Sequence, residues 1–138
     1  MSDTPEVVAI CLCERVLQDI FRRDAVTLVN VHNLISSHAF PTLVPIVYVF
    51  AQLRGLQQGF TYKFKILSPK GEEITSSTEG QVEPLPNSAT LHKLISAFSG
   101  LVFPSEGTYT VVLEIDKVQV SSMPITVELV PVIQPAGV

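Results

Sequence analysis

The stretch from Phe60 to Ile66 alternates large apolar side chains with polar ones, and this period of two residues constrains the fold most strongly. Successive side chains of a β-strand point to opposite faces, so one set points to a core and the other to water. Short apolar runs recur along the rest of the chain, with prolines and glycines as turn formers between them. The sequence therefore predicts an all-β protein built from many short strands.

The spacing of these runs predicts the architecture. Seven to nine short strands with turns every 8–12 residues are typical of a Greek-key, immunoglobulin-like β-sandwich. The expected strands cover residues 7–13, 25–35, 43–53, 60–66, 72–78, 89–98, 109–115, 118–120 and 125–129. With 138 residues, the chain has the length of one domain, which we place at residues 1–130. Residues 131–138 are expected to form a flexible tail.

The segment after the first run leaves two interpretations open. Val16, Leu17, Ile20 and Phe21 are spaced as on one face of a short helix, but a strand continuing through a bulge fits them as well. We expect at most one short helical segment near residues 15–21, and only strands elsewhere.

Charge and hydrophobicity exclude several classes of partner. The chain carries 9 Lys and Arg against 13 Asp and Glu, so it lacks the basic excess of a nucleic-acid binder. No apolar run approaches the roughly 20 residues needed to span a membrane, and the acidic start does not resemble a signal peptide. We therefore expect a cytoplasmic protein with no nucleic-acid or membrane partner.

The two cysteines are expected to be structural. Cys11 and Cys13 stand two residues apart and share a face if they lie in a strand. A disulfide between them would close a strained ring in extended backbone, and a zinc site normally needs four ligands. We interpret both as small buried thiols.

Motifs at both ends of the chain carry a resemblance. In the first part of the chain these motifs are Cys13-Glu14, Asp19, residues 27–31 and Phe40-Pro41. In the last part they are residues 103–111, Asp116 and residues 123–127. Together they resemble a family of small bacterial domains of unknown function with an immunoglobulin-like fold. The resemblance implies the sandwich and brings no activity, substrate or catalytic residue. Relatives commonly place Gly after the Asp of the last hairpin, where this chain has Lys117.

Tyr109 has a structural interpretation of its own. It follows Gly107 by two residues at the start of a late strand, as in the tyrosine corner of sandwich domains. Its hydroxyl would then bond to a backbone group just upstream. The alternative is a core tyrosine at a strand start.

The search for chemistry finds no catalytic constellation. There is no nucleophile elbow, phosphate loop or dinucleotide motif, and no two of the histidines have metal-ligand spacing. We therefore predict no enzyme, catalytic residue, cofactor or metal. The alternative is a small-molecule or metal-binding domain with weak hydrolytic activity that uses His32, His92 and Cys13. His38 is expected in a loop. A structural subunit of a larger phage-like or secretion assembly is a third possibility.

The remaining candidate for a functional feature is the surface of the protein. Along residues 43–53 and the adjoining Arg54, one face carries Tyr48, Phe50, Gln52 and Arg54, a mixture of aromatic and polar groups that is enriched at interfaces. Only 16% of residues are charged and the mean hydropathy is +0.38, which suggests more apolar surface than one small sandwich hides. We predict a non-catalytic protein-interaction or structural module that forms a homo-oligomer or binds a protein partner through this face.

Overall fold

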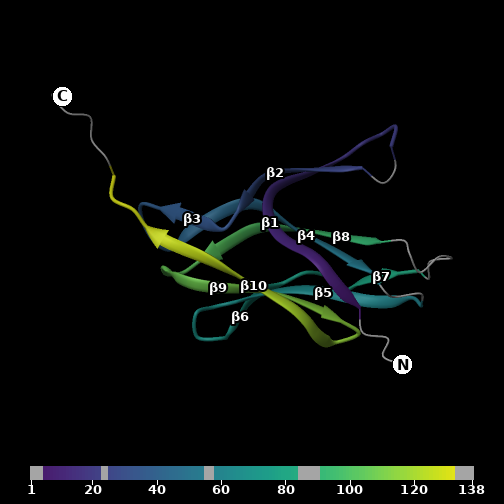
Figure 1. Ribbon diagram of the computed structural model, residues 1–138. Helices are drawn as coiled ribbons and strands as arrows, with labels where there is room; N and C mark the ends of the chain where they lie inside the picture. The colour runs from purple at the N-terminus through teal and green to yellow at the C-terminus, as the bar shows by residue number, and fades with distance from the viewer. Residues whose placement is uncertain (1–4, 23–24, 55–57, 84–90, 133–138) are drawn as a thin grey trace.

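The computed structural model shows two β-sheets packed face to face (Figure 1). The structure describes residues 5–22, 25–54, 58–83 and 91–132. Within these ranges every element is a strand, which confirms the all-β sandwich. The strand number is ten rather than seven to nine. The immunoglobulin-like, Greek-key subtype stays a prediction.

Four of the strands form one sheet and six form the other. The four-stranded sheet has the order β2 (Val26–His32), β1 (Glu6–Gln18), β4 (Thr42–Arg54) and β8 (His92–Phe103). The six-stranded sheet has the order β3 (Leu34–Ser37), β10 (Val118–Leu129), β9 (Gly107–Ile115), β5 (Phe60–Leu67) and β6 (Glu73–Ser76), and β7 (Gly80–Val82) also pairs with β5. The chain therefore crosses repeatedly from one sheet to the other.

The core lies between the sheets and follows the alternation that the sequence predicts. On β5 and β9 it takes Phe64, Ile66, Tyr109 and Leu113, each almost fully buried. On β1 and β4 it takes Leu12 together with the odd-numbered row Val47, Val49, Ala51 and Leu53. The even-numbered residues from Ile46 to Arg54 therefore point to the outside of the four-stranded sheet.

The segment near residues 15–21 is a strand and a turn, so the helical interpretation is wrong. β1 continues to Gln18 and pairs with β2 in one unbroken register. Beyond it, the Asp19 amide donates to the Ala25 carbonyl at 3.0 Å, and Asp19 Oδ1 accepts from the Phe21 and Arg22 amides. Ile20 and Phe21 are 85% and 89% exposed at the tip of a hairpin that projects from the body (Figure 1). Their spacing reflects that tip rather than a helix face.

Two predicted strand boundaries are corrected. Residues 25–35 form two strands rather than one, because the chain bends at Asn33 and its carbonyl accepts from the Thr126 amide of the other sheet. Residues 118–129 form the single strand β10, which absorbs a register shift between Gln119 and Ser121. The three-residue strand β7 lies outside the strands that the sequence predicts.

The corner before β9 has the predicted geometry. The Tyr109 hydroxyl donates to the Ser105 carbonyl at 2.7 Å, and its ring packs edge-on against Phe103 with centroids 4.8 Å apart. Gly107 has a φ of +148°, and a Cβ there would lie 2.6 Å from Pro69 Cγ. Only glycine suits that position. The hydrogen bond from the Tyr109 hydroxyl to the Ser105 carbonyl confirms the tyrosine corner.

Candidate interaction face

The outer face of the four-stranded sheet brings the predicted interaction residues together, and we call it the apolar face. Tyr48, Phe50, Gln52 and Arg54 form one row along β4, between β1 and β8. Cross-strand pairing extends this row on both sides. Cys11 and Ile95 flank Phe50, Cys13 and Ala97 flank Tyr48, and Ala9 and Lys93 flank Gln52.

The four predicted residues differ in accessibility. Phe50 is only 5% exposed, since its neighbours cover the ring, so it fills the face rather than protruding from it. Tyr48 and Gln52 are half-buried. Arg54 is exposed at the end of the strand and forms a two-pronged ion pair with Glu6 at 2.7 and 2.9 Å. The Arg54 guanidinium lowers the pKa of Glu6, so the pair stays ionised at neutral pH.

Sequence reasoning missed the members of this face on the neighbouring strands. Ile95 and Ala97 lie in a stretch whose strand character is clear, but its pairing with β4 leaves no local mark in the sequence. Ile46, which continues the β4 row beyond Tyr48, is also exposed. The available signal was the low charge of residues 91–99, where Lys93 is the one charged residue.

The cysteines occupy the positions that the sequence predicts. Both are free thiols on β1, with Cys13 buried and Cys11 half-buried. Burial, with a smaller contribution from Cys13, raises the pKa of Cys11 to about 11, and burial also raises the pKa of Cys13. Both therefore remain protonated at neutral pH, where they pack as small apolar groups.

The alternative metal or small-molecule site is not assembled. His32 is paired across from Leu12, and His92 across from Leu53, so both histidines share the inner face of the sheet. Cys13 is adjacent to Leu12 on β1 and therefore points to the opposite face. His92 packs edge-on against Phe60, and His38 Nδ1 lies 3.0 Å from the Val130 carbonyl. Within the ranges that the structure covers, no cluster of three or more His, Cys, Asp or Glu could hold a metal ion.

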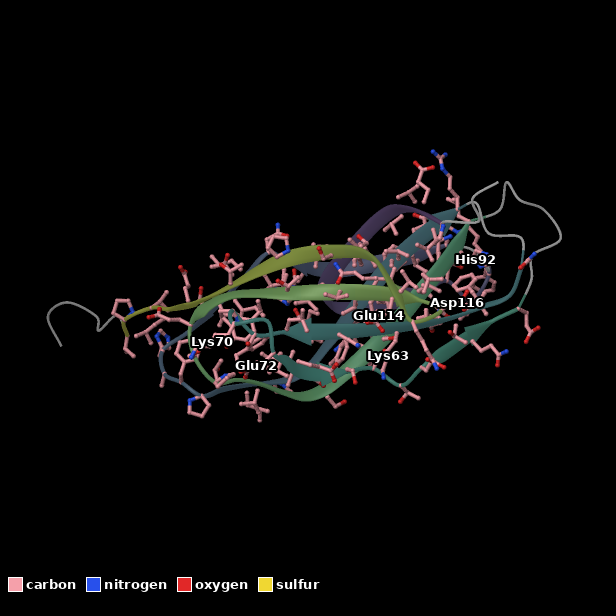
Figure 2. All side chains as sticks on the ribbon, turned by 90° about the horizontal axis from the view of Figure 1, so that it is seen from below. Lys63, Lys70, Glu72, His92, Glu114 and Asp116 are labelled. Carbon is pink, nitrogen blue, oxygen red and sulfur yellow. The ribbon has the colours of Figure 1, made fainter. Side chains whose placement is uncertain are left out.

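The opposite outer face of the molecule is polar. Figure 2 looks onto the six-stranded sheet and shows Lys63 and Glu114 on it, with Asp116 near one end and Lys70 and Glu72 near the other. Lys65 bridges Glu114 at 2.9 Å and Glu73 at 3.6 Å. The outer side of the six-stranded sheet thus carries ion pairs at its centre. On the outer side of the four-stranded sheet the Arg54–Glu6 ion pair lies at the end of β4, and the centre carries aliphatic, aromatic and thiol groups.

The fold and this face define a two-sheet β-sandwich domain with one apolar outer surface. A family model for a family of unknown function, DUF6941, matches residues 8–128, and the chain belongs to that family. No match is found among curated proteins. In the part of the chain that the structure describes, no helix is long and apolar enough to cross a membrane. The bacterial origin stays a prediction.

Proposed function

We propose that this domain is a non-catalytic module that works through protein contacts made by the apolar face, with a second copy of the chain as its first partner. One observation carries the proposal: the centre of the four-stranded sheet is apolar on its outer side, whereas the centre of the six-stranded sheet carries ion pairs on its outer side. Antiparallel sheets commonly keep one face wet with polar side chains. A second apolar face, in addition to the core face, is expected to be covered in use.

The composition of the apolar face fits a protein partner. Aromatic residues and Arg are enriched at interfaces, whereas charged groups are depleted at their centres. Tyr48 and Phe50 lie at the centre of the face, and the Arg54–Glu6 ion pair lies at its rim. A symmetric dimer is the commonest way for a small domain to cover such a surface. The two free thiols fit a reducing compartment, so we place the protein in the cytoplasm.

A charge placed on the apolar face tests this proposal. Ile95→Lys puts a cation beside Phe50 on the apolar face, and Val118→Lys puts the same cation on the six-stranded sheet, where Val118 is 63% exposed. Light scattering at tens of micromolar is expected to show an assembly for the wild type and for Val118→Lys, and a smaller mass for Ile95→Lys. Equal masses for the two variants would contradict the assignment of the contact to the apolar face.

A further inference from the structure

The hairpin of β1 and β2 continues beyond the body of the sandwich as a two-stranded arm, which we define as residues 14–22 and 25–30. β1 pairs with β4 only as far as Cys13, and its later residues pair with β2 alone among the strands that the structure describes. Figure 1 shows the arm projecting away from the other strands. An isolated two-stranded hairpin is marginally stable in water at best, so such an arm gains stability when another surface packs against it.

The tip of the arm is apolar and held in one conformation. Ile20 and Phe21 are 85% and 89% exposed, more than any other large hydrophobic residue in the described part of the chain. Asp19 Oδ1 accepts from the Phe21 and Arg22 amides at 2.8 Å each, and Asp19 Oδ2 accepts from the Arg22 guanidinium at 2.9 Å. These bonds fix the backbone of the tip in advance, which lowers the entropy that it loses on binding.

The charge of the arm favours a protein surface as its partner. Residues 14–30 contain three acidic and three basic residues, so this stretch has no net charge. The Arg22 guanidinium is already paired with Asp19. A nucleic acid or an anionic lipid surface attracts segments with a basic excess. The uncharged, apolar tip instead fits an apolar protein surface.

The apolar face is a surface of this kind, but the arm cannot cover the face of its own chain. The arm continues the line of β1 in an unbroken register, so its tip lies beyond the end of the face. Leu17 stands four residues after Cys13, so the strand period places it on the same outer side, where it is 46% exposed. The outer side of the arm therefore extends the apolar face past the body, where a second copy can pack on it.

From this geometry we infer that two copies oppose their apolar faces and that the arm of each copy lies across the apolar face of the other. The inference rests on the proposed self-association and names the segment that makes the contact. The dimensions agree. The five strand residues after Cys13 extend the arm by about 17 Å, and the row from Tyr48 to Arg54 is about 20 Å long. A two-fold axis makes the exchange of arms reciprocal, so the assembly closes as a dimer.

A fluorescent reporter at the tip tests this contact. The chain has no tryptophan, so Phe21→Trp introduces a single one. We expect its emission to shift to shorter wavelength as the concentration rises through the range in which light scattering shows assembly. Val118→Trp, on the six-stranded sheet, is the matched control and is expected to keep the emission of an exposed indole. An assembling Phe21→Trp protein whose emission does not shift would overturn the arm contact and leave the self-association standing.

Removal of the aromatic ring tests the energy of the contact. The Phe21 side chain is exposed in one copy, so we expect Phe21→Ser to leave the urea midpoint of the monomer unchanged. The dissociation constant of the dimer is expected to rise about ten- to hundredfold, because the ring is no longer buried on association. Val118→Ser should leave that constant unchanged. Equal constants for Phe21→Ser and the wild type would overturn the arm contact, and a monomeric wild type would overturn the self-association as well.

Lipid vesicles test the other class of partner for an apolar tip. Vesicles of phosphatidylcholine and phosphatidylserine are added to the Phe21→Trp protein at a concentration at which it is monomeric. We expect its emission to stay unchanged. A shift to shorter wavelength would assign the tip to a lipid surface instead of a second copy and would overturn the inference.

Discussion

At the residue scale, the Tyr109 hydroxyl is the polar group whose loss is easiest to interpret. It donates to the Ser105 carbonyl at 2.7 Å from a fully buried ring. Tyr109→Phe removes the bond and leaves the ring in place. We expect the free energy of unfolding to fall by about 1 kcal/mol, because a part-buried hydrogen bond to the Ser105 carbonyl is lost. Urea denaturation measures this, and an unchanged midpoint would mean that the ring alone stabilises the corner.

The cysteines provide a residue-scale prediction about pH. The folded pKa of Cys11 is raised to about 11, above the value of about 8.5 for an unfolded chain. Because the protonated thiol is favoured in the fold, this contribution to stability is complete below about pH 8.5 and is lost as the pH rises towards 11.

The same raised pKa makes the thiols slow nucleophiles. At pH 8 we expect alkylation of the native protein by iodoacetamide to be at least about tenfold slower than alkylation of the urea-unfolded chain. The rate should keep rising with pH above 9, as the thiolate of Cys11 forms. A native rate at pH 8 equal to the unfolded rate would contradict the burial of both thiols.

Residue-scale features were predictable where they depend on neighbours in sequence. The tyrosine corner needs only Gly107, Tyr109 and the four-residue reach back to Ser105, and the shared face of Cys11 and Cys13 follows from the strand period. The near-complete burial of Phe50 was not predictable. It depends on Cys11 and Ile95, which come from strands distant in sequence.

At the element scale, the turn between β9 and β10 places two residues other than glycine in left-handed backbone, and Lys117 is the less favourable of the two. Asp116 and Lys117 have φ values of 48° and 69°, the left-handed pair that a type I′ hairpin requires. Lys117→Gly is expected to raise the free energy of unfolding by about 0.5–1 kcal/mol, since glycine adopts positive φ without steric cost.

Asp116→Gly is the matched control for that turn. It makes the same backbone change one residue earlier, but it removes the Asp116 carboxylate that accepts from the Thr61 amide at 3.0 Å and lies 3.3 Å from its hydroxyl. We expect this variant to be less stable than the wild type in urea. Two variants with the same gain would mean that the hydrogen bonds to Thr61 contribute nothing.

Elements were predictable in kind but less so in extent. The alternation in residues 60–66 identified β5, and Pro41 and Pro69 lie in breaks between strands. Pro45 and Pro124, in contrast, lie within β4 and β10. Apolar spacing could not separate a helix from a hairpin at residues 15–21, because the pairing of β1 with β2 is a non-local property. The same limit explains why residues 25–35 read as one strand although the chain changes sheets at Asn33.

At the scale of the whole molecule, the proposed function depends on the difference in chemistry between the two outer faces. Low charge predicted excess apolar surface, and the sheet order shows where that surface lies. The sheet order could not be predicted from the sequence, because it depends on which strands become neighbours.

The mass of the wild-type protein in solution tests the central claim most directly. Multi-angle light scattering across a concentration series up to tens of micromolar measures it without any substitution. The account predicts a mass that rises with concentration towards twice the 15.1 kDa of one chain. A mass that stays at 15.1 kDa on concentration would contradict it, and would leave the apolar face without the partner assigned to it.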